Sequence, residues 1–117
     1  MTLLEVLAAV RTALKDVAPA FIRDAVPRVG GVPQLPDRCI IIDLITDSTV
    51  RDFTSVYNSI LVQVGCWAPS IAQALDDLEA ARVTLEAHEL KFDLVRVNAM
   101  QTDEQYRGVT ADFTTLY

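Results

Sequence analysis

The residues that could perform covalent chemistry are few: the chain has one histidine, His88, and two cysteines, Cys39 and Cys66. A cysteine beside a histidine can act as a nucleophile once the imidazole has removed its proton. Nothing in the local sequence supports such a pair here. A single histidine near the end of an expected helix is typical of a solvated cation, and cysteines within expected strands are typical of small apolar packing. We therefore expect no catalytic residue and no enzymatic activity.

The acidic residues offer only a weak metal-binding pattern. Asp43, Asp47 and Asp52 could gather near one expected hairpin and bind a divalent cation, but their spacing matches no known calcium loop. Asp76 and Asp77 are adjacent on an expected helix, where neighbouring side chains point about 100° apart, as on a solvated face. The sequence therefore predicts neither a bound metal nor a cofactor.

The composition indicates one acidic domain with an excess of apolar residues. A chain of 117 residues is long enough for a single core, so we expect one domain over residues 1–117. Its formal net charge of -6 argues against nonspecific binding to nucleic acid, which requires a basic surface. Apolar residues make up 51% of the chain. They indicate either a core rich in alanine and valine or apolar surface that a partner covers.

The amino-terminal sequence is not typical of a targeting segment. It has no basic leader, and Arg11, Lys15 and Asp16 interrupt its apolar residues. No stretch of the chain approaches the roughly 20 apolar residues that a membrane span needs. We expect a soluble protein, with no membrane partner, whose thiols stay reduced in a cytoplasm.

Two amphipathic helices are expected. The first begins at a capping box formed by Thr2 and Glu5 and ends before Pro19. Its apolar stripe consists of Leu3, Leu7, Val10, Leu14 and Val17. The second begins at Pro69 or Ser70, and its apolar face consists of Ile71, Ala74, Leu75, Leu78, Ala81 and Leu85.

The strands are expected in two groups around the second helix. Before it come a short edge strand at 24–29, a strand at 39–45 that is apolar on both faces, a polar connection at 46–53 and a long strand at 55–66. Because both faces of the 39–45 strand are apolar, we expect a covering segment on its second face. After the helix come strands at 92–99 and 106–115 around a loop at 100–105, with Val109, Ala111 and Phe113 facing inward.

The expected fold is α+β, with element order α-β-β-β-α-β-β. Short polar connections between neighbouring strands favour antiparallel pairing. We therefore expect a mostly antiparallel sheet of four to five strands, with two helices packed on one face. The long hairpin between the strands at 39–45 and 55–66 is expected to project from the body.

Three segments of the chain carry a resemblance to a known family. They are Pro-Asp-Arg-Cys-Ile-Ile-Ile at 36–42, Val-Gln-Val-Gly-Cys-Trp-Ala-Pro-Ser at 62–70, and Tyr-Arg-Gly-Val-Thr-Ala-Asp-Phe at 106–113. Together with the alanine-rich helix and the segment at 92–98, they resemble the tail terminators, or tail-completion proteins, of long-tailed, siphophage-type bacteriophages and phage-like particles. The likeness covers most of the chain and is better from Cys39 onward, and the loop at 100–105 is shorter and more acidic than the resemblance leads one to expect.

The resemblance implies a viral structural role in virion assembly. Such subunits form a homo-oligomeric ring, typically a hexamer, on the last ring of the tail tube protein. The ring stops tube polymerisation and joins the tail to the head-tail connector and neck proteins. Genomic DNA would pass through the lumen without specific binding, and the protein would lie at the tail-neck junction of the virion after assembly in the host cytoplasm.

A ring subunit requires contact residues, and polar loops with isolated arginines or aromatic residues are the best candidates. Arg51 and Arg107 are either ordinary surface charge or register-setting contacts to an acid on the next subunit. Trp67 is either a core anchor or a side chain partly exposed to a neighbour. The full expected interface set is Asp47, Arg51, Asp52, Phe53, Trp67, Gln101, Asp103, Tyr106 and Arg107.

Two other functions compete with the tail terminator. A head-closure or head-tail adaptor protein of the neck has a similar size and also forms rings. A small cytoplasmic ligand-binding or enzymatic α+β domain would instead show a pocket with convergent polar groups and a stable monomer.

Overall fold

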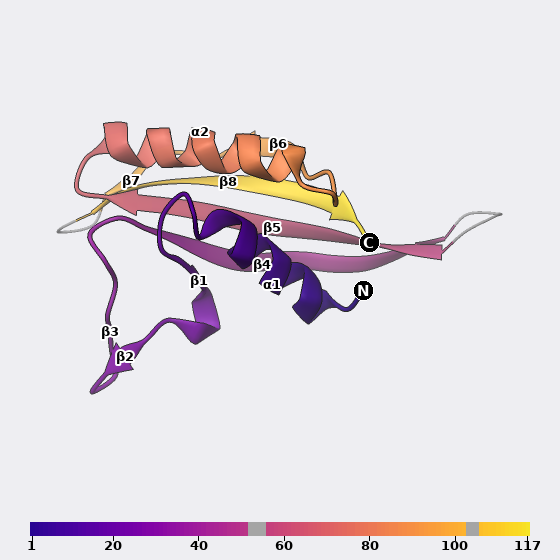
Figure 1. The fold of residues 1–117 in the computed structure, drawn as a ribbon, viewed down its shortest axis with the longest axis horizontal. Coiled ribbons are helices and arrows are strands. Elements are labelled where there is room, and N and C mark those ends of the chain that lie inside the picture. Colours follow the sequence, from indigo (N-terminus) through magenta and orange to yellow (C-terminus); the bar gives the residue numbers. More distant parts are fainter. Residues whose placement is uncertain (52–55, 103–105) are drawn as a thin grey trace.

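The computed structural model describes residues 1–51, 56–102 and 106–117, and over these residues the fold is α+β, as expected from the sequence (Figure 1). Two α-helices accompany a mostly antiparallel sheet of six strands, more than the four to five expected. Five strands follow the order β1-β4-β5-β8-β6, and β7 pairs with β8. The strands are β1 (Ala20–Ile22), β4 (Cys39–Arg51), β5 (Val56–Ala68), β6 (Asp93–Val97), β7 (Gln101–Thr102) and β8 (Arg107–Leu116).

The edge strand expected at 24–29 is wrong. A 3₁₀ turn, η1 (Arg23–Ala25), occupies its first half, and β2 (Arg28–Val29) then pairs with β3 (Val32–Pro33) in a separate hairpin. Gly30 and Gly31 make the turn with φ angles of +58° and +81°, which glycine adopts without a steric penalty. The true edge strand is β1, which runs parallel to β4. We call residues 26–36 the flap.

Both helices, α1 (Leu3–Leu14) and α2 (Ile71–Ala87), pack on one face of the sheet around a single core. From the sheet, alternate residues of β4, β5 and β8 enter this core, and the inward-facing Val109, Ala111 and Phe113 are confirmed. From the helices, the buried side chains are Val6, Leu7, Val10, Leu14, Ala74, Leu78, Ala81 and Leu85.

The helix starts follow the expected caps, with two differences. The Thr2 hydroxyl accepts from the Glu5 amide at 3.2 Å, as a capping box requires. The Glu5 carboxylate, however, accepts from the same hydroxyl and not from the Thr2 amide. The second helix begins at Ile71, because Ser70 is its N-cap and accepts from the Gln73 amide. The first helix ends at Leu14, well before Pro19.

The second face of the sheet is covered near the start of β4. Cys39 and Ile41 are buried there, which confirms the expected covering segment, and the flap supplies part of the cover. Further along the same face the side chains are polar: Asp43, Gln63 and Asp112 lie opposite one another on β4, β5 and β8. We call this the outer face.

The β4–β5 hairpin extends past the rest of the sheet, as expected from its length (Figure 1). The pairing of β8 with β5 stops at Leu116 opposite Ser59, whereas β4 and β5 remain paired as far as Arg51 and Val56. The segment at 46–51 is therefore strand and not the expected connection. The radius of gyration is 14.7 Å, against about 13 Å for a compact domain of this length. The molecule measures 51 × 31 × 23 Å, so it is elongated.

The carboxyl-terminal third differs from the expectation in its strand bounds and in one additional short strand. β6 is shorter than the expected 92–99, and β7 lies within the expected loop at 100–105. β8 begins one residue later and ends one residue later than expected. Among the described residues, no helix is long and apolar enough to cross a membrane.

Candidate partner-binding surface

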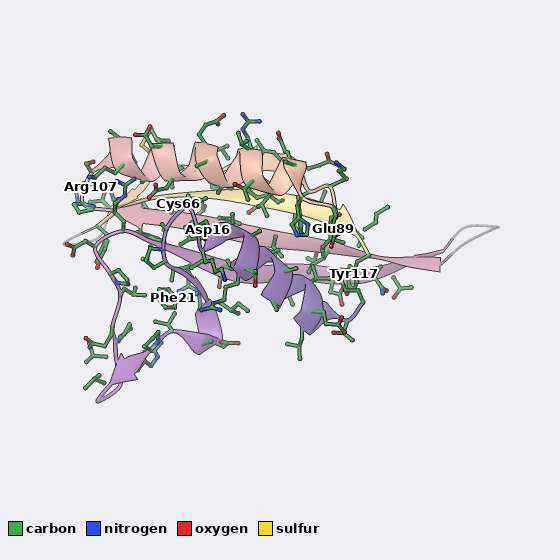
Figure 2. The ribbon with its side chains drawn as sticks, viewed as in Figure 1. Asp16, Phe21, Cys66, Glu89, Arg107 and Tyr117 are labelled. Atoms are coloured by element: carbon green, nitrogen blue, oxygen red, sulfur yellow. The ribbon has the colours of Figure 1, made fainter. Side chains whose placement is uncertain are left out.

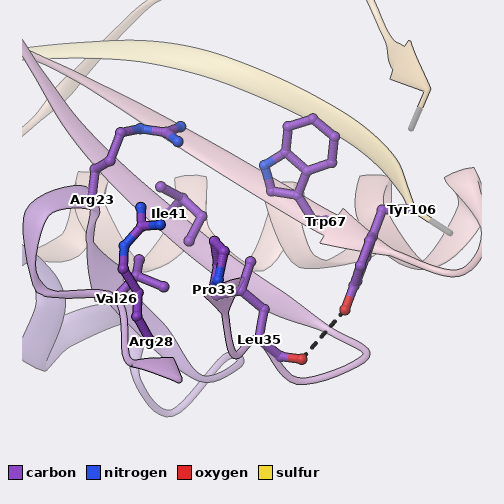
Figure 3. Close-up of a pocket in the computed structure, with 8 residues that line it drawn as sticks. All are labelled: Arg23, Val26, Arg28, Pro33, Leu35, Ile41, Trp67 and Tyr106. Carbon is purple, nitrogen blue, oxygen red and sulfur yellow. Dashed lines mark hydrogen bonds between the residues drawn. The ribbon is translucent and has the colours of Figure 1, made fainter. Parts of the chain in front are cut away.

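A groove of about 410 Å³ lies between the flap and the outer face of the sheet (Figure 3). Its floor is Ile41 on β4, and Trp67 at the end of β5 forms one wall. The flap and the turn before it form the other wall, where two arginines lie beside apolar residues. The lining residues are Arg23, Val26, Arg28, Pro33, Leu35, Ile41, Trp67 and Tyr106. Aromatic and arginine side chains around an apolar floor are typical of protein-binding surfaces.

Two glycines allow the Trp67 ring to lie flat on the sheet. Trp67 is opposite Gly108 on β8, and a Cβ atom built on Gly108 would lie 2.5 Å from the ring atoms Cε3 and Cζ3. A Cβ atom built on Gly65 would lie 3.1 Å from the indole Nε1. The ring is half-buried and lines the groove, so Trp67 is neither a core residue nor a fully exposed one.

Tyr106 connects the start of β8 to the end of the flap. Its hydroxyl lies 3.1 Å from the carbonyl oxygen of Pro36 and 3.4 Å from that of Leu35, to which it donates (Figure 3). Partial burial raises the pKa of the phenol, which keeps it a donor at neutral pH. Tyr106 thus holds the flap in place at the mouth of the groove.

Arg107 and Gln101 lie beside a second depression, of about 390 Å³, at the start of α2. Gln101 on β7 is opposite Gly108, and Arg107 is opposite Ala68 on β5. Arg107 donates from Nη1 to the carbonyl oxygen of its neighbour Tyr106. Four of the expected contact residues, Trp67, Gln101, Tyr106 and Arg107, therefore gather at one end of the sheet, the groove end.

The other expected contact residues do not join this group. Asp47 lies toward the opposite end, the hairpin end, where its carboxylate accepts from the Tyr117 hydroxyl at 2.7 Å. Tyr117 and Arg107 lie toward these two opposite ends of the sheet (Figure 2). That hydrogen bond is the main cause of the raised pKa of Tyr117. Arg51 is the last residue of β4, and its side chain lies outside the described set. Asp52, Phe53 and Asp103 lie outside the described residues altogether.

A row of polar side chains crosses the outer face of the sheet. At one end Arg23 donates to both oxygens of Asp43, at 2.6 and 2.9 Å. Gln63 follows on β5 and donates to Asp112 on β8 at 3.3 Å. At the other end the Asp112 carboxylate, only 2% exposed, accepts from Arg96 Nε on β6 at 2.6 Å. Asn98 also donates to this carboxylate. Because its partners come from β5, from β6 and from the residue just after β6, Asp112 on β8 ties these segments together on this face of the sheet.

Asp77 is not on a solvated face as expected. It is buried, and both of its oxygens accept from Arg38, at 2.6 and 3.2 Å. The hydrogen bonds to Asp77 raise the pKa of the Arg38 guanidinium. This bidentate pair joins α2 to the residue that immediately precedes β4.

The possible nucleophile pair does not form. Cys39 and Cys66 are both buried, and they lie on opposite faces of the sheet, because Cys66 is opposite Ile40. His88 lies after α2, accepts from the Leu90 amide at Nδ1 and stacks edge-on against Phe92. Cys66 is opposite Val109 on β8, whereas Thr115, which donates to the carbonyl oxygen of Leu90 just after His88, is six residues further along β8. Six residues span about 20 Å at 3.3 Å per residue.

The possible cation site does not form between Asp43 and Asp47, the two of its three residues that the structure describes. Asp43 is on the outer face, whereas Asp47 is opposite the core residue Ile60, so the two carboxylates point away from each other. Over residues 1–51, 56–102 and 106–117, no three His, Cys, Asp or Glu side chains come together in a way that could hold a metal.

Burial of the two thiols predicts a loss of stability at alkaline pH. Desolvation raises the pKa of Cys39 from 9.0 to about 11 and that of Cys66 to about 12. Because the folded values exceed the unfolded ones, their contribution is complete below the unfolded pKa and is lost as pH rises through the folded pKa. Urea unfolding at about pH 8 and about pH 10.5 should show a clear fall in the free energy of unfolding, and a smaller fall for Cys66→Ala.

The matched variant separates the thiols from the tyrosines. Tyr106 and Tyr117 also have raised pKa values and contribute in the same direction. Both remain in Cys66→Ala, so the difference between the two proteins measures the thiol. An equal fall in both would contradict the role assigned to Cys66.

Several residues of this surface were not expected from the sequence. Arg28 belongs to the segment 24–29 that was wrongly expected as an edge strand, and Arg23 immediately precedes that segment. Asp112 is one acid within an alternating strand. The alternation did contain a signal for Asp112: it predicts that Asp112 faces away from the core, beside Thr110. What the pattern could not supply is the partners on neighbouring strands.

No protein-family model matches this chain, and no characterised protein matches it in sequence. The function is therefore inferred from the residues and geometry described above. Three features carry the inference: the groove end, the projecting hairpin and the outer face between them.

Proposed function

We propose that this chain is a tail terminator: a structural phage protein that forms a ring on the end of the tail tube, stops its polymerisation and joins it to the head connector. The observation that carries the proposal is the division of the subunit into two unlike ends. The groove end gathers Trp67, Tyr106 and Arg107, and the hairpin end extends β4 and β5 beyond the sheet. A cap needs two different faces, one for the tube and one for the next component.

Exposed apolar side chains support an assembly role. Large apolar residues are exposed on both helices, the flap and several strands of the described structure. A ring subunit can bury part of this apolar surface against its neighbours and against the components that it joins. The most exposed are Leu4, Val29, Met100, Met1 and Val32.

The chemistry of the described residues also favours binding over catalysis. The thiols are buried and separated from His88, and the polar groups of the outer face are engaged with one another. The groove presents arginine and aromatic side chains without a nearby acid-base or nucleophile pair in the described residues. Its size falls within the range of about 300–1,000 Å³ usual for ligand pockets, which keeps a small ligand-binding domain as the second candidate.

Electron microscopy of particles produced without this gene tests the proposal. Overlong, headless tubes of variable length are the expected result, because tube growth would have lost its stop. A plasmid copy of the gene should restore tubes of uniform length, which controls for effects on neighbouring genes. Normal tubes beside filled, unattached heads would instead assign the protein to the head side of the neck. Intact, infectious particles would contradict both assembly roles.

A further inference from the structure

The sheet has two open edges. β6 pairs with β8 and with no other described strand, so its far side is unpaired. Among the described strands, β4 pairs with β1 only through residues 40–42, and no described strand pairs with this side of β4 from residue 43 onward. Open edges present backbone donors and acceptors that can pair with another chain, and natural proteins usually protect them.

Each open edge carries an exposed, β-branched residue at a bulge. In β4 the register shifts between Leu44 and Thr46, which leaves Ile45 as the extra residue; in β6 it shifts between Leu94 and Arg96, which leaves Val95. Ile45 is 43% exposed and Val95 is 51% exposed. A bulge limits uncontrolled edge pairing, but an apolar residue placed on it gains free energy only if something covers it.

The two bulges lie at the same height along the strands. Leu44 is opposite Val62, Val62 is opposite Phe113, and Phe113 is opposite Leu94, so the pairing leads directly from one edge to the other. Ile45 and Val95 follow Leu44 and Leu94, and because β4 and β6 run in opposite directions they lie on opposite sides of this common level. In a second copy brought to the first by rotation about an axis parallel to the strands, Ile45 would lie within about 3.3 Å, the rise of one residue, of the level of Val95.

Strand direction is compatible with the same arrangement. β4, β5, β8 and β6 alternate in direction across the sheet, so β6 runs antiparallel to β4. A copy placed beside β6 in the same orientation offers its β4, and the alternation continues across the contact. The contact joins two different edges, so each copy can bind one neighbour on each side, as a closed ring requires.

The charges at the two edges are complementary. Arg96 is 62% exposed on its side chain and uses Nε for Asp112, and no described residue accepts from its two terminal nitrogens. At the same height on the opposite edge lies Asp43, whose carboxylate already accepts from Arg23 and can accept further hydrogen bonds. Arg96 of one copy would thus meet Asp43 of the next, and the polar row would continue from subunit to subunit.

We propose that copies of this chain join edge to edge, with β6 of one copy against residues 43–46 of the next. Val95 packs on Ile45, and Arg96 pairs with Asp43. This inference rests on the proposed ring and specifies its subunit contact. The strands then run along the ring axis, which leaves the groove end and the hairpin end free for the tail tube and the connector.

Two edge variants and one matched control test the contact. Val95→Lys and Ile45→Lys each place a charge at one edge, and each is expected to convert the ring to a monomer. Val83→Lys changes the same residue type at a similarly exposed position, 55%, on the helix α2, and is expected to leave the ring intact. Native mass spectrometry gives the subunit number, and circular dichroism confirms that all variants remain folded.

Mixing the two edge variants gives the sharper result. The Val95→Lys protein keeps an intact β4 edge, and the Ile45→Lys protein keeps an intact β6 edge. An equal mixture is expected to form a dimer with one copy of each and nothing larger. Amides in β6 and at 43–46 are expected to exchange more slowly in the wild-type ring than in either variant.

Three results would overturn the edge contact. They are rings formed by both edge variants, self-association of the Ile45→Lys protein through its β6 edge alone, and a wild-type protein that stays monomeric at its highest attainable concentration. The first two leave the tail terminator proposal standing with another subunit contact, whereas a lasting monomer would also favour the ligand-binding domain. The tail terminator proposal is tested separately, and it fails if particles without the gene are intact.

Discussion

Replacing Phe113 with alanine is expected to lower the free energy of unfolding by about 3–5 kcal/mol, the range for a buried phenylalanine. Phe113 is fully buried on β8, between Val62 of β5 and Leu94 of β6. It belongs to the core cluster beneath α2, so its loss leaves a cavity where helix and sheet meet. Since domains are stable by about 5–15 kcal/mol, this one change removes a large part of the total.

Urea unfolding monitored by circular dichroism measures the effect. Leu116→Ala is the control, because Leu116 lies on the same strand but is exposed, and a change within about 0.5 kcal/mol is expected there. Equal losses in the two variants would show that β8 is sensitive along its whole length, against the burial described here.

The parts of the fold that follow a simple period could be predicted from sequence. Leu7, Val10 and Leu14 repeat with the spacing of a helix, and all three are buried. Val109, Ala111 and Phe113 alternate and enter the core together. In both cases one face of a regular element has to leave water, so the pattern and the structure share a cause.

The flap was missed because its structure depends on turns and distant contacts. Pro27 was assigned to an edge strand at 24–29, whereas Gly30 and Gly31 turn the chain back after only two residues of β2. β1 is three residues long and pairs in parallel with β4, and each of its residues is paired with one that lies twenty residues later in the chain. Local sequence carries little information about a strand so short.

The surface residues also divide into those that residue type could predict and those that depend on contacts between distant elements. Trp67 and Tyr106 were expected as contact residues by type, and the structure brings them to one groove. Asp77 was misassigned because its partner, Arg38, precedes a strand far along the chain from α2. Pairings of this kind form only when the elements pack, so they lie beyond the reach of residue type and spacing.

Replacing Gly108 with alanine is expected to displace the Trp67 ring and destabilise the fold by about 1–3 kcal/mol, the usual cost of an overpacked site. The new methyl carbon would lie 2.5 Å from two ring atoms, closer than any real contact, so either the ring or the strand has to move. Trp67 is the chain's single tryptophan, and its fluorescence therefore reports the displacement directly. A red-shifted emission in the folded variant is expected, because a displaced indole is more exposed to water.

The Trp67→Ala background shows whether the ring is the cause. With the ring removed, Gly108→Ala should cost far less, so the double variant should be more stable than the sum of the two single changes predicts. Gly65→Ala provides a graded comparison: its methyl would lie 3.1 Å from Nε1 and 3.2 Å from Thr110 Cγ2, a tighter fit than usual but a smaller overlap. Strictly additive losses for Gly108→Ala and Trp67→Ala would mean that the two residues do not touch. In that case Trp67 would not lie against Gly108. The assignment of Trp67 to the groove wall, and with it the role of that wall in partner binding, would be wrong.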